Sequence, residues 1–106
     1  MDSLFISEKA RKDEYDLSAH AHQERQEEQI TIEEIEKILL KGDILEKYLN
    51  DPRGQSCLVA GIVSDEPLHV VCGTRKERLL VVTVYRPKLP VWLDYKTRAK
   101  EVKSRV

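Results

Sequence analysis

The chain has 106 residues, of which 35% are charged and 41% hydrophobic, so it can form one domain with a single modest core. This balance excludes a disordered polyelectrolyte and a membrane protein. No apolar run approaches the roughly 18 residues that a membrane-spanning helix needs. The first nine residues are too polar for a secretory signal, and we therefore expect a cytoplasmic protein.

Charge is distributed unevenly along the chain, although the net charge is only −1. Residues 1–50 hold 13 acids and 7 bases, a net charge of −6. Residues 51–106 hold 6 acids and 11 bases, a net charge of +5. Such asymmetry is typical of a nucleic-acid binder or a docking tail, and a solvated basic tail explains it equally well.

The first predicted elements in chain order are polar. Residues 1–16 lack hydrophobic periodicity, and we interpret them as a flexible N-terminal arm. Residues 17–90 then form a single domain. Its first helix begins near Ser18, whose hydroxyl can cap it, and runs to residue 28 with almost no apolar face. Packing therefore did not select most residues of this helix.

The second predicted helix has the strongest local signature in the chain. Thr31 is its N-cap, and Glu34 three residues later completes a capping box. Gly42 ends the helix. The residues with helical apolar spacing, which should face the core, are Ile35, Ile38 and Leu39.

Strands are predicted from residue 44 onward, where apolar runs alternate with turn residues. They cover residues 44–49, 56–63, 68–73 and 79–85. Connections this short join antiparallel neighbours, which makes the sheet a meander. The predicted fold is therefore α+β, with two N-terminal helices packed on a four-stranded antiparallel meander. Residues 91–106 are expected to form a basic tail or a short helix.

Two cysteines, Cys57 and Cys72, fall in the predicted strands. We expect two buried, reduced thiols, and a disulfide between neighbouring strands is the alternative. The sequence has no C-x-x-C pair, and no histidine lies near either cysteine, which argues against a zinc site. We predict neither a metal nor a cofactor.

The chain resembles the small bacterial family catalogued as domain of unknown function 4258, over residues 15–92. The matching pieces are His20-Ala21-x-x-Glu24-Arg25, Ile30-Thr31-x-x-Glu34-Ile35, Ser56-Cys57-Leu58-Val59, Pro67-Leu68-His69-Val70-Val71 and Val82-Thr83-Val84-Tyr85-Arg86-Pro87. That family looks related to the RelE-like and MqsR-like ribonuclease toxins of toxin–antitoxin pairs, of the BECR type. The resemblance implies metal-independent cleavage of an RNA substrate and a cognate antitoxin as partner. Many relatives carry a basic residue and a glycine where this chain has Glu28-Gln29.

Metal-free RNA cleavage needs a general base, a general acid and cations beside the phosphate. His20 lies in a helix with no strong core face, and imidazoles ionise near neutral pH. Glu24, one turn later, can orient it or act as the base, and Arg25 can bind phosphate. The structural alternative is that His20 is an ordinary residue of the helix surface.

His69 and Tyr85 are the other candidate proton-transfer residues, and the register of their strands decides whether they meet. An odd number of unpaired residues in the hairpin at 74–78 pairs His69 with Thr83, on one open face with Tyr85. Leu80 and Val82 then face the helices. An even number turns His69 into the core, because a one-residue slip inverts every side chain. We favour the odd case because it separates polar from apolar residues.

Four cations are candidates for contacts with RNA phosphates: Arg75, Arg78, Arg86 and Lys88. At a hairpin tip the same charges commonly serve solubility alone. Trp92 and Tyr95 can stack on bases, although packing on the sheet explains Trp92 equally well. The leading hypothesis is an RNase toxin-like enzyme, and the alternative is a non-catalytic interaction module with the same fold. A small-ligand or metal-binding protein has less support from three scattered histidines.

Overall fold

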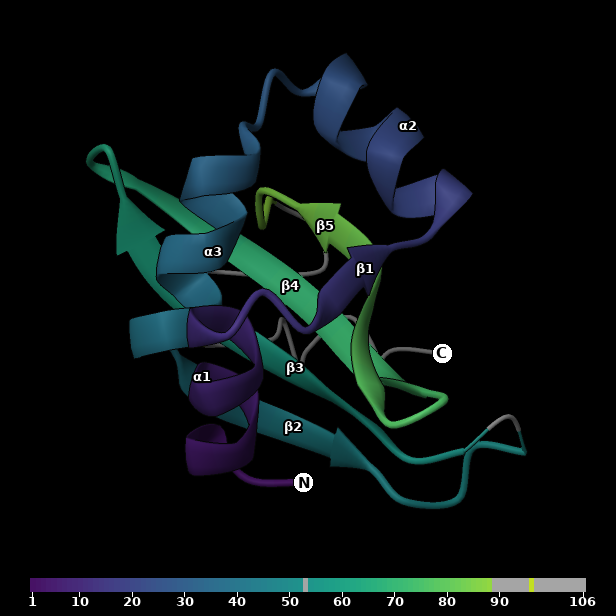
Figure 1. Ribbon diagram of the computed structural model, residues 1–106. Helices are drawn as coiled ribbons and strands as arrows, with labels where there is room; N and C mark the ends of the chain where they lie inside the picture. The colour runs from purple at the N-terminus through teal and green to yellow at the C-terminus, as the bar shows by residue number, and fades with distance from the viewer. Residues whose placement is uncertain (53, 89–95, 97–106) are drawn as a thin grey trace, which may run out of the picture.

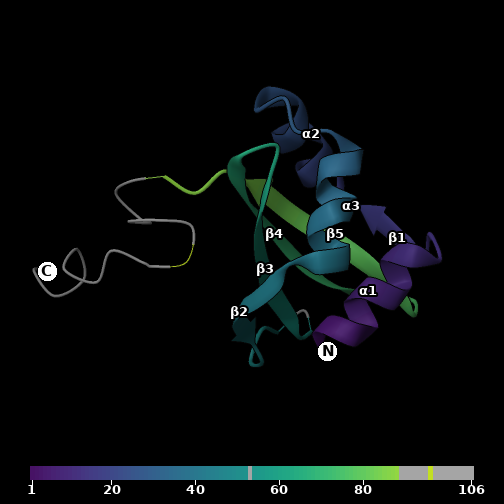
Figure 2. The ribbon, with the colours of Figure 1, turned by 90° about the vertical axis from the view of Figure 1, so that its left-hand side faces the viewer.

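Three helices and one five-stranded sheet make up the computed structural model, which describes residues 1–52, 54–88 and 96 (Figure 1). In chain order the elements are α1 (Ser3–Arg11), β1 (Tyr15–Leu17), α2 (Ala19–Glu27), α3 (Ile32–Lys41), β2 (Asp43–Tyr48), β3 (Ser56–Val63), β4 (Glu66–Arg75) and β5 (Arg78–Tyr85). Figure 2 shows α1 and α3 on one face of the sheet, with α2 beside β5. The other face carries no helix from the described residues, and we call it the open face.

The sheet has the strand order β1-β5-β4-β3-β2. Strands β2 to β5 form the predicted antiparallel meander. The prediction of a wholly antiparallel, four-stranded sheet is wrong, because β1 joins β5 in parallel and makes the sheet mixed. A three-residue strand carries too little alternation to be predicted from sequence.

The prediction of a flexible arm over residues 1–16 is also wrong. Asp2 caps α1, and its carboxylate accepts a hydrogen bond from the amide of Phe5 at 2.9 Å. Ile6 and Ala10 are each 1% exposed and belong to the core. Two apolar positions one turn apart are a weak periodic signal, so burial against the rest of the fold determines this helix.

Helix α3 agrees with its sequence signature. Thr31 and Glu34 form the capping box, with the hydroxyl of Thr31 accepting from the amide of Glu34 at 3.0 Å. The three predicted core residues, Ile35, Ile38 and Leu39, are buried. Gly42 caps the C-terminus, and its lack of a side chain is required: a Cβ would lie 2.7 Å from both the Ile38 carbonyl and Val59 Cγ1.

The predicted tail at residues 91–106, with Trp92 and Tyr95, lies outside the described residues apart from Lys96. The amine of Lys96 lies 3.5 Å from a carboxylate oxygen of Asp43. None of the helices among the described residues is both long and apolar enough to cross a bilayer.

Candidate functional site

The polar helix α2 closes the part of the β5 edge that β1 leaves open. Strand β1 pairs with β5 only as far as Val81. The amide of Ser18 then donates to the Val81 carbonyl at 2.9 Å, and its hydroxyl donates to the Val82 carbonyl at 3.0 Å. The same hydroxyl accepts from the amide of Ala21 at 3.0 Å, so Ser18 caps α2 as predicted and also attaches it to the sheet.

Two carboxylates of α2 continue this edge beyond Ser18. Glu24 Oε1 accepts from the amide of Val84 at 3.1 Å, and Glu28 Oε1 accepts from the amide of Arg86 at 3.3 Å. Four helical residues rise about 6 Å, and two strand residues rise about 6.6 Å. Because these rises match, two glutamates one turn apart reach alternate amides of the strand and replace a neighbouring strand.

His20 lies on the first turn of α2, and its side chain is 65% exposed. Its Nε2 is 3.1 Å from the second carboxylate oxygen of Glu24. Arg25 makes different contacts: its Nε donates to His22 Nδ1 at 3.3 Å, and its Nη1 donates to the Ile30 carbonyl at 3.4 Å. The structure therefore brings His20 and Glu24 together, whereas Arg25 contacts the connection between α2 and α3.

His69 on β4 lies directly opposite Tyr85 on β5, not opposite Thr83 as predicted. Its Nδ1 is 3.1 Å from the Tyr85 hydroxyl, and the rings meet edge to face at a centroid distance of 5.1 Å. The neighbouring pair, Val70 and Val84, belongs to the core under the helices. Since side chains alternate along a strand, His69 and Tyr85 share the open face.

The register differs from the prediction because of two features of the β4–β5 hairpin. Its turn leaves two residues, Lys76 and Glu77, unpaired, and both have positive φ. This even number alone would turn His69 into the core, but a bulge shifts the register by one residue between Val71 and Cys72. The bulge restores the predicted face for His69, and bulges leave little mark in sequence.

The bulge also explains why the prediction for the first half of β5 is wrong. Leu80 and Val82 were expected to face the helices, yet both are half-buried and line a cavity with the open-face residue Thr83. Leu79 and Val81 occupy the core instead, each 0% exposed.

His69 is completely buried, with 0% of its surface exposed, whereas Tyr85 is half-buried. The candidate proton-transfer residues thus form two separate pairs. His20 and Glu24 lie at the outer edge of β5, and His69 and Tyr85 lie on the open face. Val84, whose amide donates to Glu24, precedes Tyr85 in β5.

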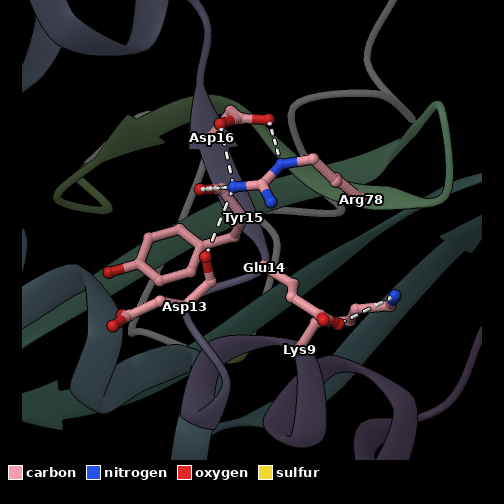
Figure 3. Close-up of polar contacts among 6 residues, drawn as sticks. All are labelled: Lys9, Asp13, Glu14, Tyr15, Asp16 and Arg78. Carbon is pink, nitrogen blue, oxygen red and sulfur yellow. Dashed lines mark hydrogen bonds and ion pairs between the residues drawn. The ribbon is translucent and has the colours of Figure 1, made fainter.

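Arg78 holds the start of β5 to β1, while 42% of its side chain stays exposed (Figure 3). Its Nε and Nη2 donate to the two carboxylate oxygens of Asp16 at 2.9 and 3.2 Å. Its Nη2 also donates to the carbonyls of Asp13 and Tyr15. The hydrogen bond from Arg78 holds the pKa of Asp16 below its usual value.

Arg86 is also engaged within the fold, at the other end of β5. Its Nε lies 3.3 Å from a carboxylate oxygen of Glu66, its Nη2 lies 3.9 Å from one of Glu34, and 18% of its side chain is exposed. Arg75 and Lys88 are exposed. Arg78 and Arg86 are separated by about 26 Å, the length of eight strand residues, so the four cations do not form one cluster.

A cavity of about 450 Å³ lies on the open face across β3, β4 and β5, and we call it the sheet groove. Its described lining residues are Tyr48, Asp51, Gly54, Gln55, Ser56, Val71, Gly73, Thr74, Leu80, Val82 and Thr83. Asp51 is the one charged residue in this described lining. The sheet groove thus offers apolar, hydroxyl and amide groups, and none of His20, His69 or Tyr85 lines it.

Sequence reasoning missed Glu28 and treated Glu24 only as a catalytic candidate. The available signal was a pair of glutamates four residues apart on a helix that has no apolar face to explain its position. The described residues hold no group of three histidine, cysteine or acidic side chains placed to bind a metal ion.

These features define a small α+β protein in which a polar helix closes the edge of a mixed sheet. The chain belongs to the family described as Domain of unknown function (DUF4258), whose family model matches residues 17–86. The matched region includes both pairs of candidate residues and the sheet groove. No curated protein and no solved structure matches the chain.

Proposed function

We propose that this chain is a non-catalytic protein-interaction module on a scaffold related to the RelE-like and MqsR-like ribonuclease toxins. The burial of His69 carries the proposal. A general acid or base must come within hydrogen-bond distance of the proton that it transfers. An imidazole that is 0% exposed does not meet this requirement for an RNA bound from solution.

The contacts of Glu24 support the same conclusion. One of its oxygens accepts from the Val84 amide, and the other lies against His20. Both oxygens of the carboxylate are therefore engaged, and one of them closes the β5 edge. Glu24 therefore serves the fold, and His20 is attached to a structural residue.

The sheet groove is the proposed binding surface, and its occupant is an extended, apolar and uncharged segment of a partner protein. Val71, Leu80 and Val82 supply apolar contacts, and the hydroxyls of Ser56 and Thr83 supply polar ones. Phosphate binding depends on cations, and Asp51 is the one charge among the described lining residues. This lining favours a polypeptide over an RNA backbone.

A displayed library of linear peptides tests the sheet groove with the full chain. Val82→Asp places a charge in the sheet groove, and Ile62→Asp places the same charge at an apolar side chain that is 59% exposed outside it. We expect apolar peptides to bind the wild type and Ile62→Asp but not Val82→Asp. Enrichment of charged peptides, or equal binding by all three folded proteins, would contradict the proposal.

A metal-independent ribonuclease is the second candidate, and the exposed His20 beside Glu24 favours it. This pair has the arrangement of a general base held by a carboxylate, and a cognate antitoxin would then cover it. The test incubates labelled single-stranded RNA with the wild type and with His20→Ala in excess chelator. Cleavage by the wild type alone would establish the ribonuclease, whereas intact RNA with both proteins favours the interaction module.

A further inference from the structure

Two thiols meet in the core, on strand positions next to residues that line the sheet groove. Cys57 on β3 and Cys72 on β4 are directly opposite each other in the register, and their sulfurs are 3.9 Å apart. Both are free thiols, exposed by 1% and 0% respectively. Opposite residues of antiparallel strands have Cα atoms about 4.5–5.5 Å apart, which lies within the range that a disulfide spans.

Cys57 has a small cavity beside it, whereas Cys72 is 0% exposed. Cys57 lines this cavity of about 40 Å³ together with Met1, Lys47, Leu49, Gln55 and Ser56. A cavity of this size holds a molecule about as large as water. Hydrogen peroxide fits this limit, and a tripeptide thiol or disulfide does not.

We propose that Cys57 and Cys72 form a redox site that reacts with hydrogen peroxide and closes to a disulfide between β3 and β4. In the first step the Cys57 thiolate attacks one peroxide oxygen, the O–O bond breaks, and hydroxide leaves. Cys57 becomes a sulfenic acid. In the second step the Cys72 sulfur attacks the Cys57 sulfur and releases the sulfenic oxygen as water. The two sulfurs lose two electrons, which reduce the peroxide.

The cavity beside Cys57 assigns these roles, and the electrostatics of the pair agree with them. The hydrogen bond between the two sulfurs lowers the pKa of Cys57, and the positive charges of the Met1 amine and Lys47 lower it further. The same hydrogen bond and burial raise the pKa of Cys72. Since the thiolate is the nucleophile, Cys57 reacts first and Cys72 remains the proton donor until it resolves the sulfenic acid.

The reaction is tested on the full chain by mass spectrometry, with alkylation after unfolding. After peroxide treatment we expect the wild type to lose two hydrogens, to resist alkylation at both cysteines, and to regain both thiols with dithiothreitol. Cys72→Ala should gain one oxygen at Cys57, and dimedone added on unfolding traps this sulfenic acid. Cys57→Ala should keep the Cys72 thiol alkylatable at the same peroxide dose.

Three results would overturn the proposal: two alkylatable thiols in treated wild type, a disulfide between two chains, or equal oxidation of Cys72 in Cys57→Ala. Circular dichroism verifies that each variant is folded. If a variant does not fold, the wild type decides: the folded chain should form the internal disulfide at a lower peroxide dose than the urea-unfolded chain, because folding fixes the thiols side by side.

Discussion

Helices α2 and α3 follow each other along the chain but are held to the sheet by different interactions. Helix α3 buries Ile35, Ile38 and Leu39 against the core. Helix α2 buries only Ala21 and is attached through Ser18, Glu24 and Glu28, which bind the backbone of β5. An apolar stripe indicates which face of a helix is buried, whereas a polar helix can be placed by backbone groups that need hydrogen-bond partners.

This contrast changes how the polar residues of α2 are interpreted. Because α2 has no apolar face, its sequence suggests a catalytic role for the polar residues His20, Glu24 and Arg25. The structure gives Glu24 and Arg25 structural contacts and leaves His20 exposed beside Glu24. An open strand edge thus accounts for polar residues that packing cannot explain.

The largest loss of unfolding free energy is expected when a buried side chain of α3 is removed. Ile35→Ala removes a side chain that is 0% exposed and should lower the free energy of unfolding by about 2–5 kcal/mol. Ile32→Ala is the matched control on the same helix, because Ile32 is 38% exposed. Urea denaturation followed by circular dichroism measures both. Equal losses for the two variants would contradict the assignment of the buried face.

The second-largest effect is expected from weakening the attachment of α2 to β5. Glu24→Ala leaves the Val84 amide without its carboxylate acceptor and should cost about 1–3 kcal/mol of unfolding free energy. Glu27→Ala is the control, because Glu27 is exposed and its carboxylate accepts only from Gln23 among the described contacts. Hydrogen exchange of the Val84 amide should accelerate in Glu24→Ala alone. Unchanged exchange would show that α2 is held by other contacts.

The sequence predicts those parts of the fold whose signals are local. The capping box at Thr31, the apolar stripe of α3 and the four meander strands follow from patterns within ten or so residues. Helix α1 and strand β1 could not be predicted, because Ile6 and Tyr15 are fixed by contacts with distant segments. The face of His69 depended on the bulge in the β4–β5 pairing, which nothing in its residues reveals.

For the candidate site, the sequence predicted the pairing of His20 with Glu24 and the shared face of His69 and Tyr85. It could not predict the burial of His69 or the partners of Arg78 and Arg86. Those depend on Asp16, Glu34 and Glu66, which are brought close only by the folded sheet. Residue types can therefore suggest catalysis where the fold uses the same groups as supports.

Loss of the α3 cap should have a smaller effect than either change above. Thr31→Ala removes the hydroxyl that accepts from the Glu34 amide and should cost about 1 kcal/mol of unfolding free energy. Thr31→Ser keeps the hydroxyl and is the control, expected to unfold close to wild type. Chemical denaturation resolves the two. A serine variant as unstable as the alanine variant would assign the loss to the methyl group instead.

The smallest effect is expected at Asp16, and its sign depends on pH. Arg78 lowers the pKa of Asp16 in the folded chain below the unfolded value of about 3.9. The stabilisation is therefore complete above the unfolded pKa and is lost as pH falls through the folded pKa. Asp16→Asn should lower the urea midpoint modestly at neutral pH, and this difference from wild type should shrink in acid.

Glu27→Gln is the control for Asp16→Asn, because it removes the same charge from an exposed side chain whose pairing is within its own helix. Its difference from wild type should stay small at every pH at which the chain is folded. A difference for Asp16→Asn that persists below the folded pKa of Asp16 would show that its hydrogen-bond geometry, rather than its charge, holds β1 to the start of β5. The polar attachment of β1 would then resemble that of α2, where backbone groups rather than ion pairs fix the position.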